Sequence, residues 1–207
     1  MAHTPPAAEV RILALGDSYT IGEGVPVDDR WPMQLERVLR AQGLNVSTPV
    51  IVARTGWTTD ELSAGVDVAR PTGTFDLVTL LIGVNNQYRG RAAEEYRTQF
   101  RALLARAIGF AGGRAGHVIV ISIPDWGATP FARGRDRAAI ARDIDAFNGV
   151  NRDESARAGA KYVDVTAISR RAAVEPDLIG DDNLHPSSSM YAAWVQAMMP
   201  AVLDAIH

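Results

Sequence analysis

The 207-residue sequence contains no cysteine. Disulfide bonds, thiolate metal sites and a cysteine nucleophile are therefore excluded. Histidine is scarce as well, with four residues in the chain, and Lys161 is the only lysine among 21 basic residues. Chemistry that depends on an imidazole as general base consequently has very few candidate residues.

Long apolar runs and strong net charge are also absent. No run approaches the roughly 18 apolar residues of a membrane-spanning helix. The first residues, MAHTPPAAEVR, have neither the basic region nor the apolar core of a signal peptide. The formal net charge of -3 does not favour a nucleic-acid partner. We therefore expect a cytoplasmic protein without a transmembrane segment and without affinity for nucleic acid.

The residues that are present have an ordinary globular composition, 47% hydrophobic and 22% charged. Five short apolar runs predict strands that are buried on both faces, and apolar residues at helical spacing lie between them. This alternation predicts an α/β fold, a single-domain three-layer α/β/α sandwich with a parallel five-stranded sheet. The domain is expected to occupy residues 10–207, after an N-terminal tail of residues 1–9. The predicted strands are Val10–Leu15, Val50–Ala53, Leu77–Ile82, Val118–Ile123 and Tyr162–Val165.

The first loop after a predicted strand, GDSYTIGEG, carries Ser18. In a parallel sheet, ligands bind at the carboxyl ends of the strands, where this loop lies. Its glycines do not have the spacing of a dinucleotide-binding loop, and it lacks the lysine of a P-loop. The G-x-S-x-G nucleophile elbow is also absent, because Thr20 stands where that motif has its second glycine. Two interpretations of Ser18 are left open, a nucleophile and a simple turn residue.

A serine nucleophile needs a general base, and His185 is the best placed histidine. His3 and His207 lie at the chain ends, where catalytic residues are poorly held. His117 begins the fourth predicted strand, at the edge opposite the loops. His185 lies in the loop DDNLHPSSS, just before the last predicted helix.

An acidic partner for this histidine is available in the same loop. Asp182 precedes His185 by three residues, so one loop can present both side chains. The carboxylate would accept the Nδ1 proton and leave Nε2 free to accept from Ser18. Asp181, one residue earlier, is the alternative partner.

Two further loops offer hydrogen-bond donors for an oxyanion. Gly56 lies in RTGWTTDE, where Thr58 and Glu61 predict a capping box and hence a helix start. A glycine beside a helix start lets backbone N–H groups approach an anion closely. Asn85, in GVNN after the third strand, adds a side-chain amide. Both residues have a simpler interpretation as turn formers.

Four blocks together resemble the SGNH or GDSL-type hydrolases, a superfamily of serine esterases and lipases. The blocks GDSYTIGEG, RTGWTTDE, GVNN and DDNLHP occur in the family's order and span residues 14 to 186. The resemblance implies a flavodoxin-like SGNH fold and catalysis without metal or cofactor. Two residues depart from the family pattern: Tyr19 stands in place of leucine in G-D-S-L, and Asn86 in place of aspartate in G-x-N-D.

The resemblance also implies a role for each matched residue. Ser18 would be the nucleophile, His185 the base and Asp182 its partner. The oxyanion hole would consist of the Ser18 N–H, the Gly56 N–H and the Asn85 amide. The implied reaction cleaves a small-molecule carboxylic ester, with a small or medium acyl group, through an acyl-serine.

Other side chains of the same loops are candidates for substrate binding. For the aromatic residues, two interpretations are open: they form an acyl pocket, or they pack in the protein interior. For the arginines, the two interpretations are contact with an anionic or lipid head group and simple exposure to solvent. Two alternatives to an esterase stay open, a thioesterase or lysophospholipase on the same triad and a non-catalytic binding module. The candidates are the aromatic residues Trp57, Tyr88, Trp126 and Phe131 and the arginines Arg89, Arg91, Arg133 and Arg135.

Overall fold

The computed structural model describes residues 9–206, so most of the predicted tail, together with His3 and His207, lies outside the described residues. The sheet has five parallel strands in the order β2-β1-β3-β4-β5, which confirms the predicted parallel sheet. One strand has the predicted bounds, and the ends of the others shift by one or two residues. The strands are β1 (Ile12–Gly16), β2 (Val50–Ala53), β3 (Leu77–Leu81), β4 (Val118–Ile121) and β5 (Lys161–Val163).

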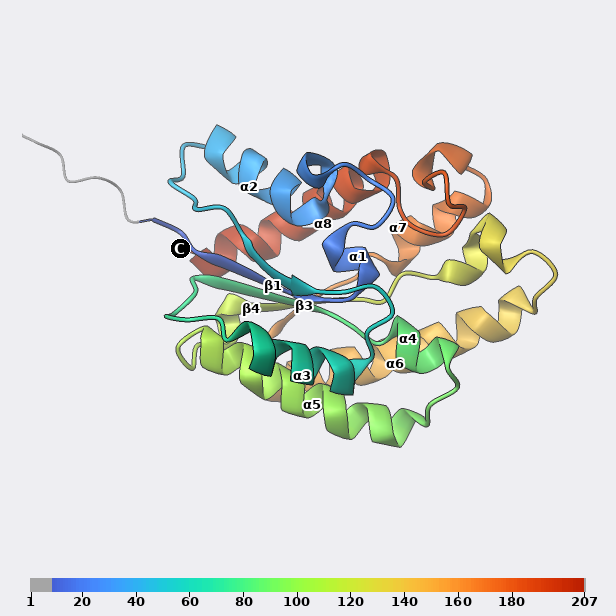
Figure 1. Cartoon of the computed structure of the whole chain (residues 1–207), viewed down its shortest axis with the longest axis horizontal. Coiled ribbons are helices and arrows are strands. Elements are labelled where there is room, and N and C mark those ends of the chain that lie inside the picture. The colour runs from blue at the N-terminus through green and yellow to red at the C-terminus, as the bar shows by residue number, and fades with distance from the viewer. Residues whose placement is uncertain (1–8, 207) are drawn as a thin grey trace, which may run out of the picture.

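Helices cover both faces of the sheet, as predicted for a three-layer sandwich. In Figure 1, α2 and α8 lie above the sheet and α3, α5 and α6 lie below it. The helices are α1 (Ser18–Ile21), α2 (Trp31–Ala41), α3 (Thr59–Ala69), α4 (Val84–Tyr88), α5 (Ala93–Phe110), α6 (Arg137–Ala158), α7 (Thr166–Arg170) and α8 (Ser188–Ile206). Short 3-10 turns are η1 (Val27–Asp29), η2 (Ala115–His117), η3 (Trp126–Ala128), η4 (Pro130–Ala132), η5 (Arg171–Ala173) and η6 (Pro176–Leu178). No helix within residues 9–206 is long and apolar enough to cross a membrane.

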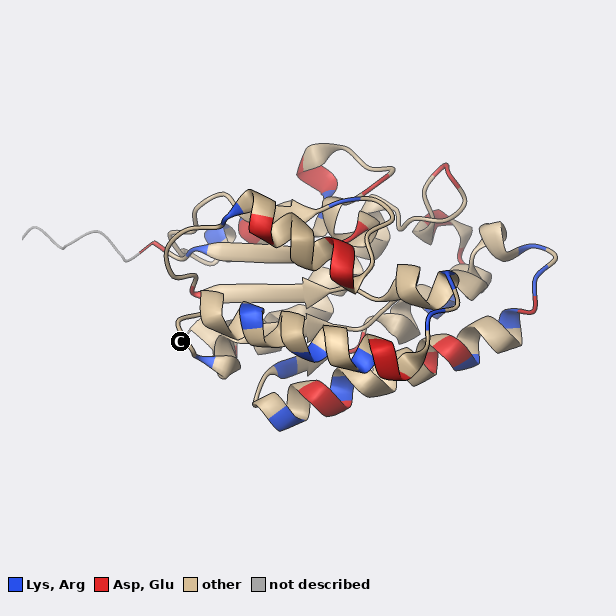
Figure 2. Cartoon of the chain, turned by 60° about the horizontal axis from the view of Figure 1, so that its bottom comes forward, with Lys and Arg blue, Asp and Glu red and all other residues tan. Residues whose placement is uncertain are grey.

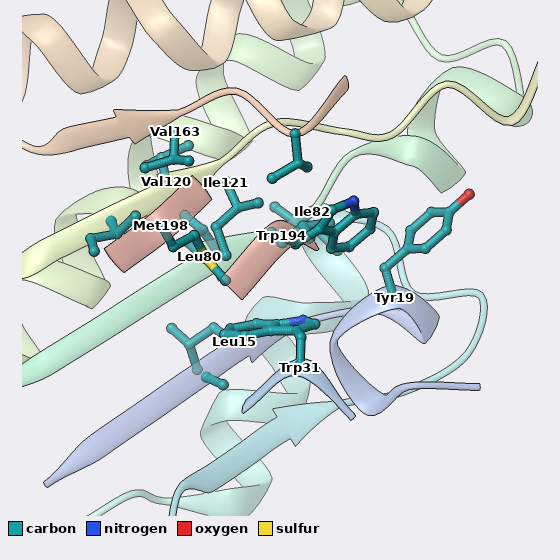
Figure 3. Packing of buried hydrophobic residues seen from close by; sticks show 14 of the residues in the cluster. Leu15, Tyr19, Trp31, Leu80, Ile82, Val120, Ile121, Val163, Trp194 and Met198 are labelled. Carbon is teal, nitrogen blue, oxygen red and sulfur yellow. The ribbon is translucent and has the colours of Figure 1, made fainter. Parts of the chain in front are cut away.

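The packing of the core explains why the strand sequences are continuously apolar. All five residues of β1 and all five of β3 are buried, because helices cover the sheet on both sides. Figure 3 shows Trp31 of α2 and Trp194 of α8 packed beside Leu15 and Leu80 of these two strands. Both tryptophans are fully buried. This packing fixes the carboxyl ends of β1 and β3, from which the candidate loops emerge.

The strand order places those loops around one crevice. The chain winds one way from β1 to β2 and the other way from β1 through β3 to β5, so the order reverses between β1 and β3. Such a reversal opens a crevice at the carboxyl ends of the two strands. The loop with Ser18 follows β1, and Asn85 follows β3. His117 lies at the amino end of β4, where its Nδ1 contacts the Asp76 carbonyl oxygen at 2.9 Å, away from this crevice.

Candidate active site

A pocket of about 190 Å³ lies at the carboxyl ends of β1 and β3. It brings together three of the residues with predicted catalytic roles, from three separate loops, and most of the predicted aromatic side chains. No acidic residue is in its lining. The lining residues are Ser18, Tyr19, Val84, Asn85, Tyr88, Trp126, Phe131, Leu184 and His185.

Ser18 is held by a tight turn between β1 and α1. It is the first residue of α1, and the Asp17 carboxylate caps this helix by accepting from the Tyr19 N–H at 3.0 Å. A Cβ atom on Gly16 would lie 2.1 Å from the Thr20 hydroxyl, so no larger residue fits at that position. The turn therefore needs both the glycine and the aspartate that precede the serine.

Asp17 is itself fully buried, and its second carboxylate oxygen has no hydrogen-bond partner among the described residues. Burial penalises the charged form and raises the pKa of Asp17 to about 7, against an opposing hydrogen bond from the Tyr19 N–H. The structure thus gives Asp17 a supporting position behind Ser18, since it is absent from the pocket lining.

His185 and Asp182 lie on one tight turn. Asn183, between them, has a positive φ of 64°, which brings their side chains together. The Nδ1 atom of His185 is 2.5 Å from the Asp182 Oδ2 atom, and Oδ1 accepts from the N–H groups of His185 and Leu184 at 2.9 Å each. Partial burial opposes ionisation, but these hydrogen bonds hold the pKa of Asp182 below its usual value. Asp181, the alternative partner, forms no hydrogen bond or ion pair with the His185 side chain in the described part of the chain.

The predicted oxyanion donors occupy different positions relative to the pocket. Asn85 lines it, and its amide Nδ2 donates one hydrogen bond of 2.9 Å to the Trp57 carbonyl oxygen. The other amide hydrogen is left for a further acceptor. Gly56 is not in the pocket lining, although its φ of 83° favours glycine and its carbonyl oxygen accepts from Arg89 at 2.7 Å. Within residues 9–206, no hydrogen bond uses the N–H of Gly56 or of Ser18.

Three of the four predicted aromatic residues form one wall of the pocket. The ring centroids of Tyr88 and Trp126 are 5.3 Å apart, and those of Trp126 and Phe131 are 6.0 Å apart. Both pairs meet edge to face, the arrangement that aromatic quadrupoles favour. The indole of Trp126 is further fixed by a 2.9 Å hydrogen bond from Nε1 to Gln87.

The fourth predicted aromatic residue, Trp57, lies outside this pocket. Its indole packs over Gly65 of α3, where an added Cβ would come within 2.1 Å of the ring. It lines a shallow groove beside β2 instead. The turn at Gly56 directs the Trp57 side chain onto α3, while the Trp57 carbonyl oxygen holds Asn85.

Comparison with known proteins decides the family. Residues 14–193 match the model of the GDSL-like Lipase/Acylhydrolase family. The chain belongs to this family. No curated protein sequence is significantly similar to it.

Solved structures share the fold of this GDSL-like protein. The acetylxylan esterase Axe2 from Geobacillus stearothermophilus is 18% identical, with a TM-score of 0.72, over 93% of this chain and 94% of that one. The lipase/acylhydrolase from Enterococcus faecalis is 20% identical, with a TM-score of 0.69, over 93% and 95%. The esterase EstA from Pseudoalteromonas sp., in a structure inhibited by monoethylphosphonate, is 18% identical, with a TM-score of 0.67, over 93% and 96%.

The two departures from the GDSL-type pattern have different consequences. Tyr19 lines the pocket, and its ring lies edge-on to the His185 ring with centroids 5.6 Å apart. Asn86 is fully buried away from the pocket, where its side chain accepts from the Thr59 N–H at 3.1 Å and donates to the Thr59 hydroxyl at 2.8 Å. Asn86 therefore ties α4 to the start of α3, and only Tyr19 lines the pocket of this family member.

Two lining residues, Val84 and Leu184, were not predicted from the sequence as pocket residues. Each is adjacent in sequence to Asn85 or His185. Adjacency to a predicted catalytic residue was therefore the available signal, because short loops bring neighbouring side chains to the same opening.

The four candidate arginines of this GDSL-like protein differ in their contacts. Arg89 pairs with Glu61 at 3.3 Å, and Arg91 pairs with Asp60 at 2.8 Å. Both side chains thereby tie the segment after α4 to the start of α3. Arg133 and Arg135 form no ion pair with any described residue. The latter two belong to the loop between η4 and α6.

Proposed function

We propose that the protein hydrolyses carboxylic esters through an acyl-Ser18 intermediate. The observation that carries this proposal is the arrangement around one pocket, where Ser18, Asn85 and His185 come together and Asp182 lies 2.5 Å from the far nitrogen of the His185 ring. Membership of the GDSL-like lipase and acylhydrolase family supports ester hydrolysis in general. We propose, in addition, a role for each of these residues and a small or medium size for the acyl group.

The first half-reaction transfers the acyl group to the enzyme. The Ser18 hydroxyl oxygen attacks the ester carbonyl carbon while the His185 Nε2 atom accepts its proton. The carbonyl electron pair moves onto the oxygen, and that anion accepts from the Asn85 amide and from the N–H groups of Ser18 and Gly56. The intermediate collapses, the bond to the alkoxide breaks, and His185 returns the proton to the leaving alcohol.

Water completes the cycle. His185 takes a proton from water as the water oxygen attacks the acyl carbon, and the resulting intermediate expels Ser18. The proton returns to the Ser18 oxygen and a carboxylic acid is released. Asp182 accepts from Nδ1 throughout, which fixes the tautomer and stabilises the imidazolium.

The size of the pocket supports a small or medium acyl group. A pocket of about 190 Å³ is smaller than the roughly 300–1,000 Å³ typical of sites for drug-sized ligands. Axe2, which shares the fold, is described as an acetylxylan esterase. A panel of aryl esters of increasing acyl length should therefore show its highest kcat/KM at short chains. A thioester of equal acyl length measures the preference for oxygen over sulfur.

Covalent labelling tests the proposal most directly. A neutral fluorophosphonate should add to the peptide that contains Ser18, and the chain should gain the mass of one phosphonyl group. Ser18→Ala should take no label and should not hydrolyse esters. Labelling of a different serine, or full activity in Ser18→Ala, would contradict the assignment, and a wild-type chain with neither label nor activity would favour a binding module.

A further inference from the structure

The guanidinium group of Arg135 lies over all three aromatic rings of the pocket wall. Its central carbon is 5.4 Å from the ring centroid of Tyr88, 5.3 Å from that of Trp126 and 5.5 Å from that of Phe131. Its Nη2 atom also donates to the Tyr88 hydroxyl at 3.3 Å. Arg135 is not itself in the pocket lining, but cation–π attraction to three lining rings restricts its flexible side chain and holds its charge against the pocket wall.

The guanidinium of Arg135 has no carboxylate partner within residues 9–206. Among the described residues it forms no ion pair, whereas Arg89 and Arg91 of the same face each have a carboxylate partner. Figure 2 shows blue along the loop before the long helix α6, with red next to the start of that helix. The Asp136 carboxylate is engaged elsewhere, because it caps α6 by accepting from the Ala139 N–H at 2.9 Å.

The carboxylates near the pocket lie outside its lining, from where Asp17, Asp125 and Asp182 act electrostatically on Tyr19. None of its nine lining residues is acidic. The nearest carboxylate of the catalytic arrangement, Asp182, already accepts from three donors. A planar guanidinium with free N–H groups beside an apolar wall matches the geometry of a carboxylate or phosphate.

We propose that Arg135 is a specificity-determining residue that selects esters carrying an anionic group, a carboxylate or a phosphate. The aromatic wall binds the apolar part of the substrate, and Arg135 donates to the anionic group beyond it. This inference rests on the proposed ester hydrolysis at Ser18 and adds the substrate class. The anionic group is carried by either the acyl part or the alcohol part of the ester. Two pairs of test substrates distinguish these two positions.

The test measures a ratio of kcat/KM values for an anionic and a neutral ester of similar size. In the acyl pair, a 4-nitrophenyl ester of a straight-chain acid is compared with the analogue that ends in a carboxylate. In the alcohol pair, phenyl acetate is compared with 4-acetoxybenzoate. Hydrolysis in the presence of the Ser18→Ala variant is subtracted as background.

The wild type should favour the anionic member of at least one pair. Arg135→Ala should lower that ratio by about threefold to tenfold, as expected for a charge-assisted contact that is partly screened by solvent. Arg135→Lys should give an intermediate ratio, because it keeps the charge but loses the planar fork. Raising the salt concentration should lower the ratio in the wild type more than in Arg135→Ala, because salt screens the exposed pair.

Arg133→Ala is the matched control. Arg133 lies in the same loop and carries the same charge, but it has no ring contact or ion pair among the described residues. Its removal should lower the ratio much less than removal of Arg135. Equal effects of the two variants would show that the positive charge of the loop acts as a whole and would overturn the inference. A wild type with no preference for the anionic ester would also overturn it. Arg135→Gln serves as the second neutral variant if Arg135→Ala fails to fold.

The two proposals fail in distinguishable ways. Fluorophosphonate labelling of Ser18 and hydrolysis of neutral esters, with ratios that do not respond to Arg135, would overturn only the inference on substrate class. A chain that takes no label and cleaves neither member of either pair would overturn the proposed function as well.

Discussion

Replacement of Asn85 by alanine separates the oxyanion hole from the rest of the proposed mechanism. The Asn85 amide donates one hydrogen to the Trp57 carbonyl oxygen at 2.9 Å, which leaves one hydrogen for the substrate anion. Removal of one such donor typically lowers turnover by about 100- to 1,000-fold, or roughly 2.7–4 kcal/mol. Because the contact strengthens only in the transition state, KM should change little.

The same substitution has a separate and smaller effect on stability. Asn85 is half-buried, and alanine leaves the Trp57 carbonyl oxygen without this donor. Loss of one hydrogen bond costs about 1 kcal/mol. For a chain of this size, that cost corresponds to a fall of about 2–4 °C in Tm. The folded protein at 25 °C should therefore be almost fully populated and yet almost inactive.

Asn85→Asp sharpens the test, because it keeps the size of the side chain. Its carboxylate would face the Trp57 carbonyl oxygen and the developing anion, so both activity and stability should be lower than in Asn85→Ala. Initial rates on an aryl acetate give kcat and KM, and thermal unfolding followed by circular dichroism gives Tm. If Asn85→Ala melts many degrees lower while its folded fraction turns over at nearly the wild-type rate, Asn85 is structural and the proposed oxyanion hole is wrong.

Three further predictions concern the acidic residues and the pocket wall. Asp182→Asn should lower kcat by roughly 10⁴-fold by favouring the wrong histidine tautomer, while Asp181→Asn should have little effect; similar losses in both variants would contradict the assignment. Burial raises the pKa of Asp17 from 3.8 to about 7, so the folded state binds the proton more tightly than the unfolded chain does, and wild-type stability falls as pH rises from about 4 to about 7. Asp17→Asn removes this loss of stability, which is at most roughly 4 kcal/mol. The Tm of the variant relative to that of the wild type should therefore rise between pH 4 and pH 8. A Tm difference that does not change with pH would refute the argument. Phe131→Ala should shift the preference toward longer acyl chains, whereas Trp57→Ala should not, and a panel of aryl esters measures both.

The sequence alone predicted the architecture and the loops that form the pocket. Continuous apolar runs alternating with helical patterns are sufficient for a parallel sheet, because each strand must be covered on both faces. Since the carboxyl ends of parallel strands meet at one edge, residues that follow different strands were expected to lie together. In the structure, Ser18, Asn85 and His185 do lie around one pocket.

The tertiary structure alone decided where the individual loop side chains point. Trp57 and Trp126 both follow strands and look equivalent in the sequence, yet the first packs on Gly65 and the second lines the pocket. The direction of a side chain in a loop depends on local backbone angles and on the neighbouring helix, neither of which a residue pattern encodes. In the same way, Arg135 is one exposed arginine among 21 basic residues in the sequence, and only the folded chain brings it over three rings from two separate loops.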